Sequence, residues 1–222
     1  EISAAGKILT NVDATVHSDG FVVATQTGPM EISMTAQAVS VEEADLEALL
    51  AGPLELTATG LLGEDRIAIE KAHLAGNALN ADLSGEVSRT DGSLRLDVSA
   101  DAAVSALPAA VHRVAGDRVA MTGTVARDAA GTLDVSPLSL KSGPLTAEGT
   151  VQLAGEQLAA SLKGALSDVG RLAEGATGAI TFAVDAKGKA ATPDVTLTVA
   201  ADRVEAADRA ITGLRLTASG LV

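Results

Sequence analysis

The sequence predicts a mainly β protein, built as an elongated, repeat-built and curled antiparallel sheet, groove-like or taco-like, with a few short helices. Three observations lead to this fold class. Apolar and polar residues alternate through most of the chain, which is the period of a strand with one dry face. Clusters of Gly, Asp and Ser interrupt the alternation at short intervals, as turns between strands do. The 222 residues include two Phe and no Trp or Tyr, which disfavours a tightly packed sandwich, because large rings normally fill the space between two sheets.

The first quarter of the chain predicts short strands and one helix. Alternation starts at residues 12–16, and a turn at 17–20 leads to a second strand that contains Phe21 and Val23. Another strand follows at residues 32–36. The period then changes in residues 41–52, where leucines fall at helical spacing until Gly52 and Pro53 end the segment.

The middle of the chain returns to alternation. A second helical segment is expected at residues 104–114, which ends before Gly116. Around it, strands are predicted at residues 54–59, 67–69, 79–87, 94–98 and 119–125, with turns at 90–93 and 128–131.

The last ninety residues contain the clearest pattern. Leu138 to Val151 alternates on both sides of a Gly143-Pro144 turn, which predicts two strands. A strand at residues 158–162 follows, and residues 167–175 could form a short helix. Strands resume at residues 180–184 and 195–199, with a break at 188–193.

The order of these patterns from Leu133 to Val222 resembles the TamB group of the AsmA-like superfamily, and a looser match covers most of the chain. No single motif is diagnostic, because each consists of turn residues and alternation; their order carries the resemblance. In sequence, the matching patterns are the strand pair 138–151, Ser161-Leu-x-Gly-x-Leu166, Asp168-x-x-x-Leu172, Gly178-x-Ile-x-Phe182 and the segment 188–195.

Proteins of that family are long and periplasmic, are anchored in the inner membrane and have a groove-shaped β fold. They act in outer-membrane biogenesis with a β-barrel partner and are implicated in moving phospholipid between membranes. The resemblance implies that this chain is an internal fragment located in the periplasm. It also implies an inner-membrane anchor in a segment outside the chain, and a TamA-like barrel partner that contacts other regions.

A weak internal repeat of about 64 residues runs through the sequence. Gly52, Gly116 and Gly178 each follow a helical segment and precede an alternating strand. The expected repeat boundaries within one continuous domain, residues 1–222, are 1–52, 53–116, 117–178 and 179–222. Such repeats stack on their neighbours, which predicts an elongated molecule.

Composition narrows the functional classes. The formal net charge of -13 argues against nucleic acid and against an anionic membrane surface as partners. There is no cysteine, so disulfide and thiol chemistry are excluded. No apolar run reaches the roughly 18 residues of a membrane-spanning helix.

Motifs for catalysis or metal binding are absent from the sequence. The three histidines, His17, His73 and His112, lack the spacing of metal ligands. Residues 97–101 have a superficial calcium-loop spacing, but Ala102 and Pro108 occupy the positions that require Gly and Glu. Neither a P-loop nor a Gly-x-Ser-x-Gly elbow occurs. We therefore expect no enzyme activity, no cofactor and no metal.

The apolar face of the sheet is the candidate functional surface. Three short helices cannot cover so large a face, and a curled sheet lined by small aliphatic side chains is suited to phospholipid acyl chains. The free edges of such a fragment also predict an edge-to-edge homodimer. The predicted lining consists of Leu54, Leu56, Leu79, Leu83, Leu94, Leu96, Val98, Val119, Met121, Val125, Leu145, Val151, Leu158, Leu162, Ile180, Phe182, Val184, Val195, Leu197 and Val199.

Two other functions are compatible with the same alternation. The chain could be a purely structural β-solenoid or sandwich module of a secreted or cell-surface protein, with a closed side-chain core. A polysaccharide-cleaving β-helix is disfavoured, because its clefts present aromatic and charged side chains to sugars. A lipid-sized open interior distinguishes the first hypothesis from the structural module.

Overall fold

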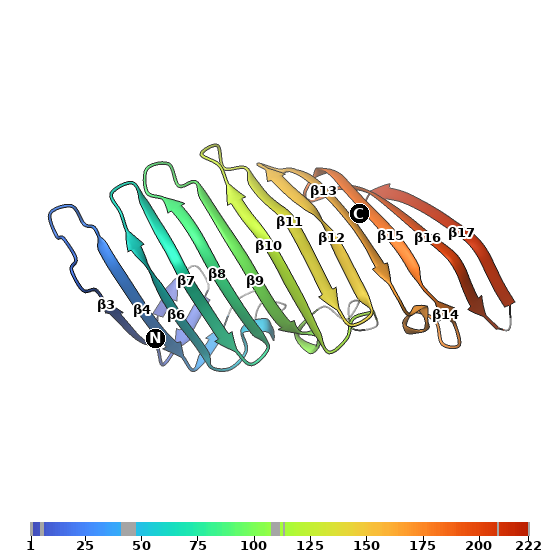
Figure 1. Ribbon diagram of the computed structural model, residues 1–222, viewed down its shortest axis with the longest axis horizontal. Helices are drawn as coiled ribbons and strands as arrows, with labels where there is room; N and C mark the ends of the chain where they lie inside the picture. The colour runs from blue at the N-terminus through green and yellow to red at the C-terminus, as the bar shows by residue number, and fades with distance from the viewer. Residues whose placement is uncertain are drawn as a thin grey trace.

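The computed structural model describes residues 2–4, 7–40, 48–107, 112, 114–207 and 209–221. It is 69% strand and 5% helix, and its main element is a fourteen-stranded antiparallel sheet that is not closed into a barrel. The strands lie side by side in a long ribbon (Figure 1). The predicted fold class is confirmed.

Strand order follows chain order almost throughout the ribbon. Each long strand pairs with the long strand before it, and the short β14 (Thr177–Gly178) pairs with β16. The other strands are β3 (Asp13–His17), β4 (Gly28–Ala36), β6 (Leu54–Leu62), β7 (Arg66–Gly76), β8 (Leu79–Ser88), β9 (Leu94–Ala103), β10 (Arg118–Arg127), β11 (Leu133–Ser142), β12 (Leu145–Ala154), β13 (Gln157–Leu166), β15 (Ile180–Lys189), β16 (Asp194–Ala206) and β17 (Arg209–Leu221).

The smaller elements lie outside this ladder. A separate three-stranded sheet contains β1 (Ile2–Ala4), β2 (Lys7–Thr10) and β5 (Ala38–Ser40). Two single turns of 3-10 helix occur in the part of the chain that the structure describes, η1 (Val104–Ala106) and η2 (Val169–Arg171).

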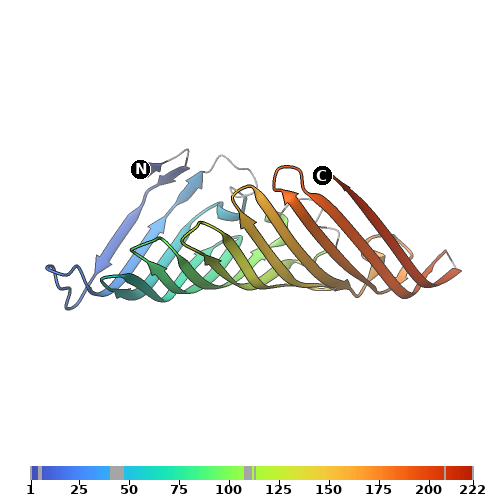
Figure 2. The same ribbon diagram turned by 90° about the horizontal axis from the view of Figure 1, so that it is seen from above.

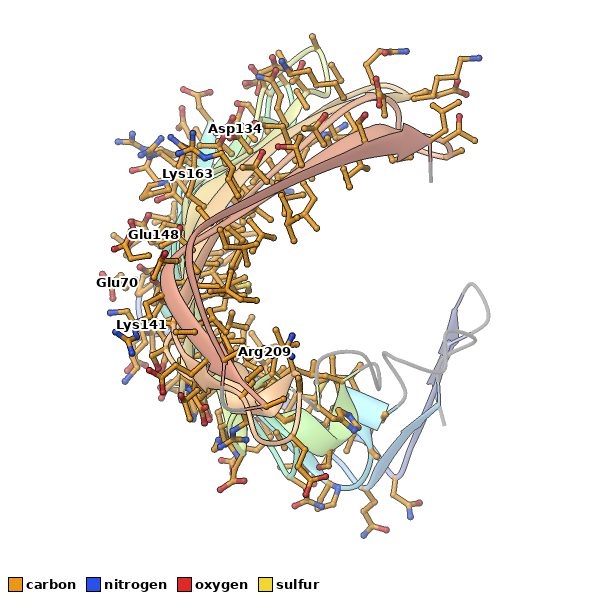
Figure 3. The ribbon with its side chains drawn as sticks, turned by 90° about the vertical axis from the view of Figure 1, so that its right-hand side faces the viewer. Glu70, Asp134, Lys141, Glu148, Lys163 and Arg209 are labelled. Atoms are coloured by element: carbon orange, nitrogen blue, oxygen red, sulfur yellow. The ribbon has the colours of Figure 1, made fainter. Side chains whose placement is uncertain are left out.

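The sheet is curved into a trough. Viewed along the ribbon, it has a C-shaped cross-section, and Glu70, Asp134, Lys141, Glu148 and Lys163 project from the convex side (Figure 3). Figure 2 shows the same strands from above, inclined across the long axis. The opposite, concave side faces the interior of the C.

Interior glycines and bulges explain the curvature. A Cβ atom at Gly85 would lie 2.1 Å from the carbonyl oxygen of Arg95, and one at Gly149 would lie 2.0 Å from that of Ser161. Gly60 and Gly164 are equally close to neighbouring backbone. The register also shifts within β7, β10 and β11. Glycine kinks and bulges at mid-strand let a sheet bend, so we call this zone the crease.

The two long edges of the trough differ. Because the strands are antiparallel, one edge holds the connections 18–27, 63–65, 89–93, 128–132, 155–156 and 190–193, which we call the turn edge. The other holds the longer connections 37–53, 104–117 and 167–179, which we call the insertion edge. Most of the buried apolar side chains, among them Val104, Ala115, Leu166, Val169 and Ala176, lie at the insertion edge.

Polar contacts fix the insertions to the sheet. The Ser142 hydroxyl donates to the carbonyl of Arg118 at 2.6 Å and accepts from the N–H of Gly116 at 3.0 Å. The Arg171 guanidinium donates to the carbonyl of Ala115 at 3.2 Å, which joins the second insertion to the third. Ser142 is 3% exposed, so both of its hydrogen bonds replace water.

Some predicted elements need correction. The predicted strand at Phe21 and Val23 is wrong, because residues 23–26 form turns. An isolated backbone bridge between Val22 and Thr27 closes these turns. The strand at 67–69 is too short, since β7 continues to Gly76 past a bulge that breaks the alternation.

Where the structure describes the three predicted helices, they contain only short helical segments. Of the predicted helix at 41–52, residues 41–47 lie outside the described residues, and 48–50 are helical. The segment at 104–114 contains η1, and its residues 108–111 and 113 also lie outside. The segment at 167–175 contains only η2.

Candidate functional site

The strand register places all twenty predicted lining residues on the concave face. Residues directly opposite each other in neighbouring strands share a face. Glu148 pairs with Lys163 on the convex side, so the alternate pair Gly149 and Leu162 is concave. Continuing the register across the sheet assigns the remaining lining residues to the same face.

Several predicted residues meet directly across neighbouring strands. The direct partners are Leu83 with Val98, Leu96 with Val125, Leu162 with Val184, Phe182 with Val199, and Val184 with Leu197. Other members of the set are joined through small residues, since Gly149 stands between Leu138 and Leu162. The predicted residues therefore belong to one continuous surface rather than to separate clusters.

The same surface contains residues that the predicted lining omits. Alternation in β4, β7 and β11 could have identified them, although the bulges of β7 and β11 interrupt the pattern. They include Met30, Ile32, Met34, Leu62, Ile67, Ile69, Leu74, Val87, Leu133, Val135, Leu138, Leu140, Leu153 and Leu166.

The two faces differ sharply in polarity. Between β6 and β15, the concave positions of the described strands include one charged side chain, Arg127, which lies at the turn edge and donates to the carbonyl of Gly92. The only other concave hydrogen-bonding side chain in this region is that of Ser142, which is occupied at the insertion edge. The convex positions carry charged residues of both signs, such as the cross-strand neighbours Glu148 and Lys163.

Concave side chains are only partly covered. Most are half-buried, while Met121 is 36% exposed and Leu197 is 38% exposed. Among the described concave residues, Leu166 at the insertion edge is the only large side chain that is buried. Because a contiguous apolar surface that reaches solvent marks a binding site more often than a core, this face is the candidate site.

A distinct hollow lies on this face near the turn edge. It has a volume of about 240 Å³ and an almost wholly apolar lining. Its concave side chains come from β4, β6 and β7, namely Met30, Ile32, Ala58, Leu62, Ile67, Ile69 and Ala72. Such a hollow suits a hydrocarbon segment.

A larger depression is lined mainly by polar and charged residues, which distinguishes it from the apolar hollow. Its volume is about 690 Å³, and its lining includes Glu70, Asp82, Asp97 and Thr122 from the convex side. The smaller hollow on the concave face is the better fit for a hydrocarbon group, because its lining side chains are almost all apolar.

Several titratable side chains of the described residues form exposed pairs and turn contacts. Among the described residues, no group of three or more His, Asp or Glu side chains is placed to hold a metal ion. His73 contacts Asp82 at 2.9 Å as an exposed cross-strand pair. Hydrogen bonds from Ser88 and Ser93 lower the pKa of Asp91 to about 2, and the Thr132 backbone N–H lowers the pKa of Asp128. Both carboxylates stabilise turns at the turn edge.

No family model, curated protein or solved structure matches this chain. The resemblance to the TamB family therefore stays a prediction. Within the described residues, no helix is long and apolar enough to cross a bilayer.

Proposed function

We propose that this chain is part of an open hydrophobic trough that carries phospholipid acyl chains, as a non-enzymatic segment of a TamB-like protein. One observation carries the proposal: from β4 to β15 the concave positions are apolar except for Arg127 and Ser142 near the two edges, and the apolar row continues in β16 to Ala201, whereas the convex face carries charges of both signs. A soluble protein gains nothing from so large an exposed apolar face unless another molecule covers it.

The geometry gives a physical route for transport. Fourteen strands at about 4.8 Å spacing span about 60 Å. An acyl chain on this face gains about 0.8 kcal/mol for each buried methylene group. Neighbouring rows of Leu, Val and Ala offer nearly equal burial, so a lipid shifting by one row exchanges similar contacts. The open side of the C leaves a polar headgroup in water.

The cellular setting rests on the sequence resemblance alone. By that resemblance, the protein works in the periplasm, is anchored in the inner membrane by a segment outside this chain, and supports outer-membrane protein assembly with a TamA-like barrel partner. The concave face itself supports only one part of the proposal, namely that the ligand is a phospholipid acyl chain.

The test combines native mass spectrometry with one charge placed in the trough. The wild-type chain is expected to copurify with phospholipid at a defined stoichiometry. Leu162→Asp places a carboxylate between Gly149 and Val184 in the trough, so it should reduce bound lipid at least tenfold while circular dichroism stays unchanged. The matched control, Ala159→Asp on the convex side of the same strand, lies opposite Lys187 and should bind lipid normally.

Two results would reject the proposal. A clean apo mass without uptake of added fluorescent lipid would favour the purely structural module. Global unfolding of Leu162→Asp would indicate a closed core, because an unpaired buried charge is very costly there.

A further inference from the structure

The connection between β3 and β4 differs from the other tight connections of the turn edge. Those at 63–65, 89–93, 128–132 and 155–156 contain Gly and acidic residues, the one at 190–193 is Ala-Ala-Thr-Pro, and none of the five contains a large apolar side chain. Residues 18–27 also contain an acidic residue and a glycine, but they expose a continuous apolar tip, in which Phe21 is 39%, Val22 50% and Val23 79% exposed. Phe21 is also one of only two aromatic residues in the chain.

This tip is held in shape by its own contacts. Val22 and Thr27 form a two-way backbone bridge, with N···O distances of 2.7 and 3.3 Å. The hydroxyls of Thr25 and Thr27 are 2.8 Å apart, and the Ser18 hydroxyl donates to the carbonyl of Pro29. A preformed loop loses little conformational entropy when its apolar side chains are covered.

The tip also adjoins the apolar hollow of the trough. A Cβ atom at Gly28 would lie 2.8 Å from the Phe21 Cα, so the loop packs against the start of β4. Two residues later, Met30 lines the hollow beside Gly60 and Leu62 of β6. Figures 1 and 2 show this loop projecting at the N-terminal end of the ribbon. Exposed apolar tip and apolar hollow are thus consecutive along one surface.

We propose that residues 21–23 dock the trough on a lipid surface with electrically neutral headgroups, from which acyl chains reach the hollow of β4, β6 and β7. The inference rests on the proposed lipid-carrying function. Charge selects the type of surface: residues 21–23 include no Lys or Arg, and the nearby Asp19 side chain is 91% exposed. The Arg89 guanidinium reaches Gln26 at the base of the loop, where it also donates to the carbonyl of Gly63. With a net charge of -13, the chain is repelled by anionic lipids.

Flotation with vesicles of pure phosphatidylcholine tests this docking. The double variant V22S/V23S removes exposed apolar groups only, so the fold should persist, and vesicle binding should fall at least tenfold because two valines no longer enter the interface. Leu172→Ser, at a 53% exposed residue of the insertion edge, is the matched control and should float like the wild type.

Headgroup charge gives a second readout. Adding phosphatidylglycerol to the vesicles should weaken wild-type binding, and Asp19→Lys should restore part of it.

Leu162→Asp should still float while carrying no extracted lipid, which separates failure of docking from failure of the trough. If Leu162→Asp floats and the wild type extracts no lipid, the docking role stands and the trough function falls.

Two outcomes would overturn the docking role. V22S/V23S could float as well as the wild type, which would show that the tip does not contact lipid. Alternatively, sedimentation velocity could show a wild-type dimer that V22S/V23S converts to a monomer, which would show that a second copy covers the tip.

Discussion

The two long edges of the trough are built from the same strands but stabilised differently. At the insertion edge, Val104, Ala115, Leu166 and Val169 are buried, and hydrogen bonds through Ser142 and Arg171 join insertions to sheet. At the turn edge, short turns close the hairpins except at residues 18–27, and the concave side chains nearby are half-buried. The molecule therefore has one packed edge and one open edge.

This difference shows how an open sheet can be stable without a closed core. The insertions supply local hydrophobic clusters at one edge, while the rest of the concave face remains accessible. A trough of this kind is expected to widen by motion of the turn edge about the crease, because fewer buried contacts resist that motion.

The largest predicted effect compares two leucines of β13. Leu166, at the insertion edge, is 2% exposed, while Leu158, on the same face at the turn edge, is half-buried. Leu166→Ala should lower the free energy of unfolding by about 2–5 kcal/mol, as truncation of a buried leucine does. Leu158→Ala should cost about 1 kcal/mol, because part of its surface already contacts water.

Urea unfolding followed by circular dichroism measures both values. Equal losses for the two variants would contradict the division into a packed edge and an open edge. A larger loss for Leu158→Ala would reverse it.

A smaller effect is expected at the crease, which sets the distance between the edges. Gly149→Ala would place its Cβ against the Ser161 carbonyl and the Leu162 Cα, so the two strands must move apart, at a cost of about 1–3 kcal/mol. Gly220→Ala meets nothing within 4 Å and is the control.

Spin labels can report the movement directly. The chain has no cysteine, so Glu156→Cys at the turn edge and Glu174→Cys at the insertion edge give a clean labelled pair. The distance distribution between the labels should shift in Gly149→Ala and not in Gly220→Ala. An unchanged distribution would mean that the interior glycines do not control curvature.

Alternation in the sequence was sufficient to predict the sheet and its apolar face. All twenty predicted lining residues share one face, because side chains alternate strictly between the two faces of a strand wherever no bulge intervenes. The same rule failed at Phe21 and Val23, where two apolar residues are too few to distinguish a strand from an apolar turn.

Alternation alone could not predict the curvature of the sheet or the packed insertion edge. Gly85 and Gly149 look like ordinary small residues in a strand, and only the neighbouring strand shows that a Cβ would strike its backbone. The partners of Ser142 lie about 25 residues away in sequence, a pairing that no local pattern encodes. The apolar hollow likewise forms only where β4, β6 and β7 lie side by side, which no single strand's pattern predicts. Whether the face carries lipid stays a prediction.

The smallest predicted effect is a pH-dependent loosening confined to the turn edge. The folded chain holds the pKa of Asp91 at about 2, mainly through hydrogen bonds from Ser88 and Ser93, whereas an unfolded Asp has a pKa of about 3.9. Because the folded pKa is depressed, this stabilisation is complete above about pH 4 and is lost as pH falls toward 2. Amide exchange of Ser93, whose N–H donates to the Asp91 carboxylate at 2.9 Å, should therefore accelerate in acid relative to its intrinsic rate.

Residues near Leu166 should stay protected over the same range, and Asp91→Asn should abolish the pH dependence. A carboxyl titration midpoint near 3.8 by NMR would show instead that the turn does not hold Asp91 in its charged form.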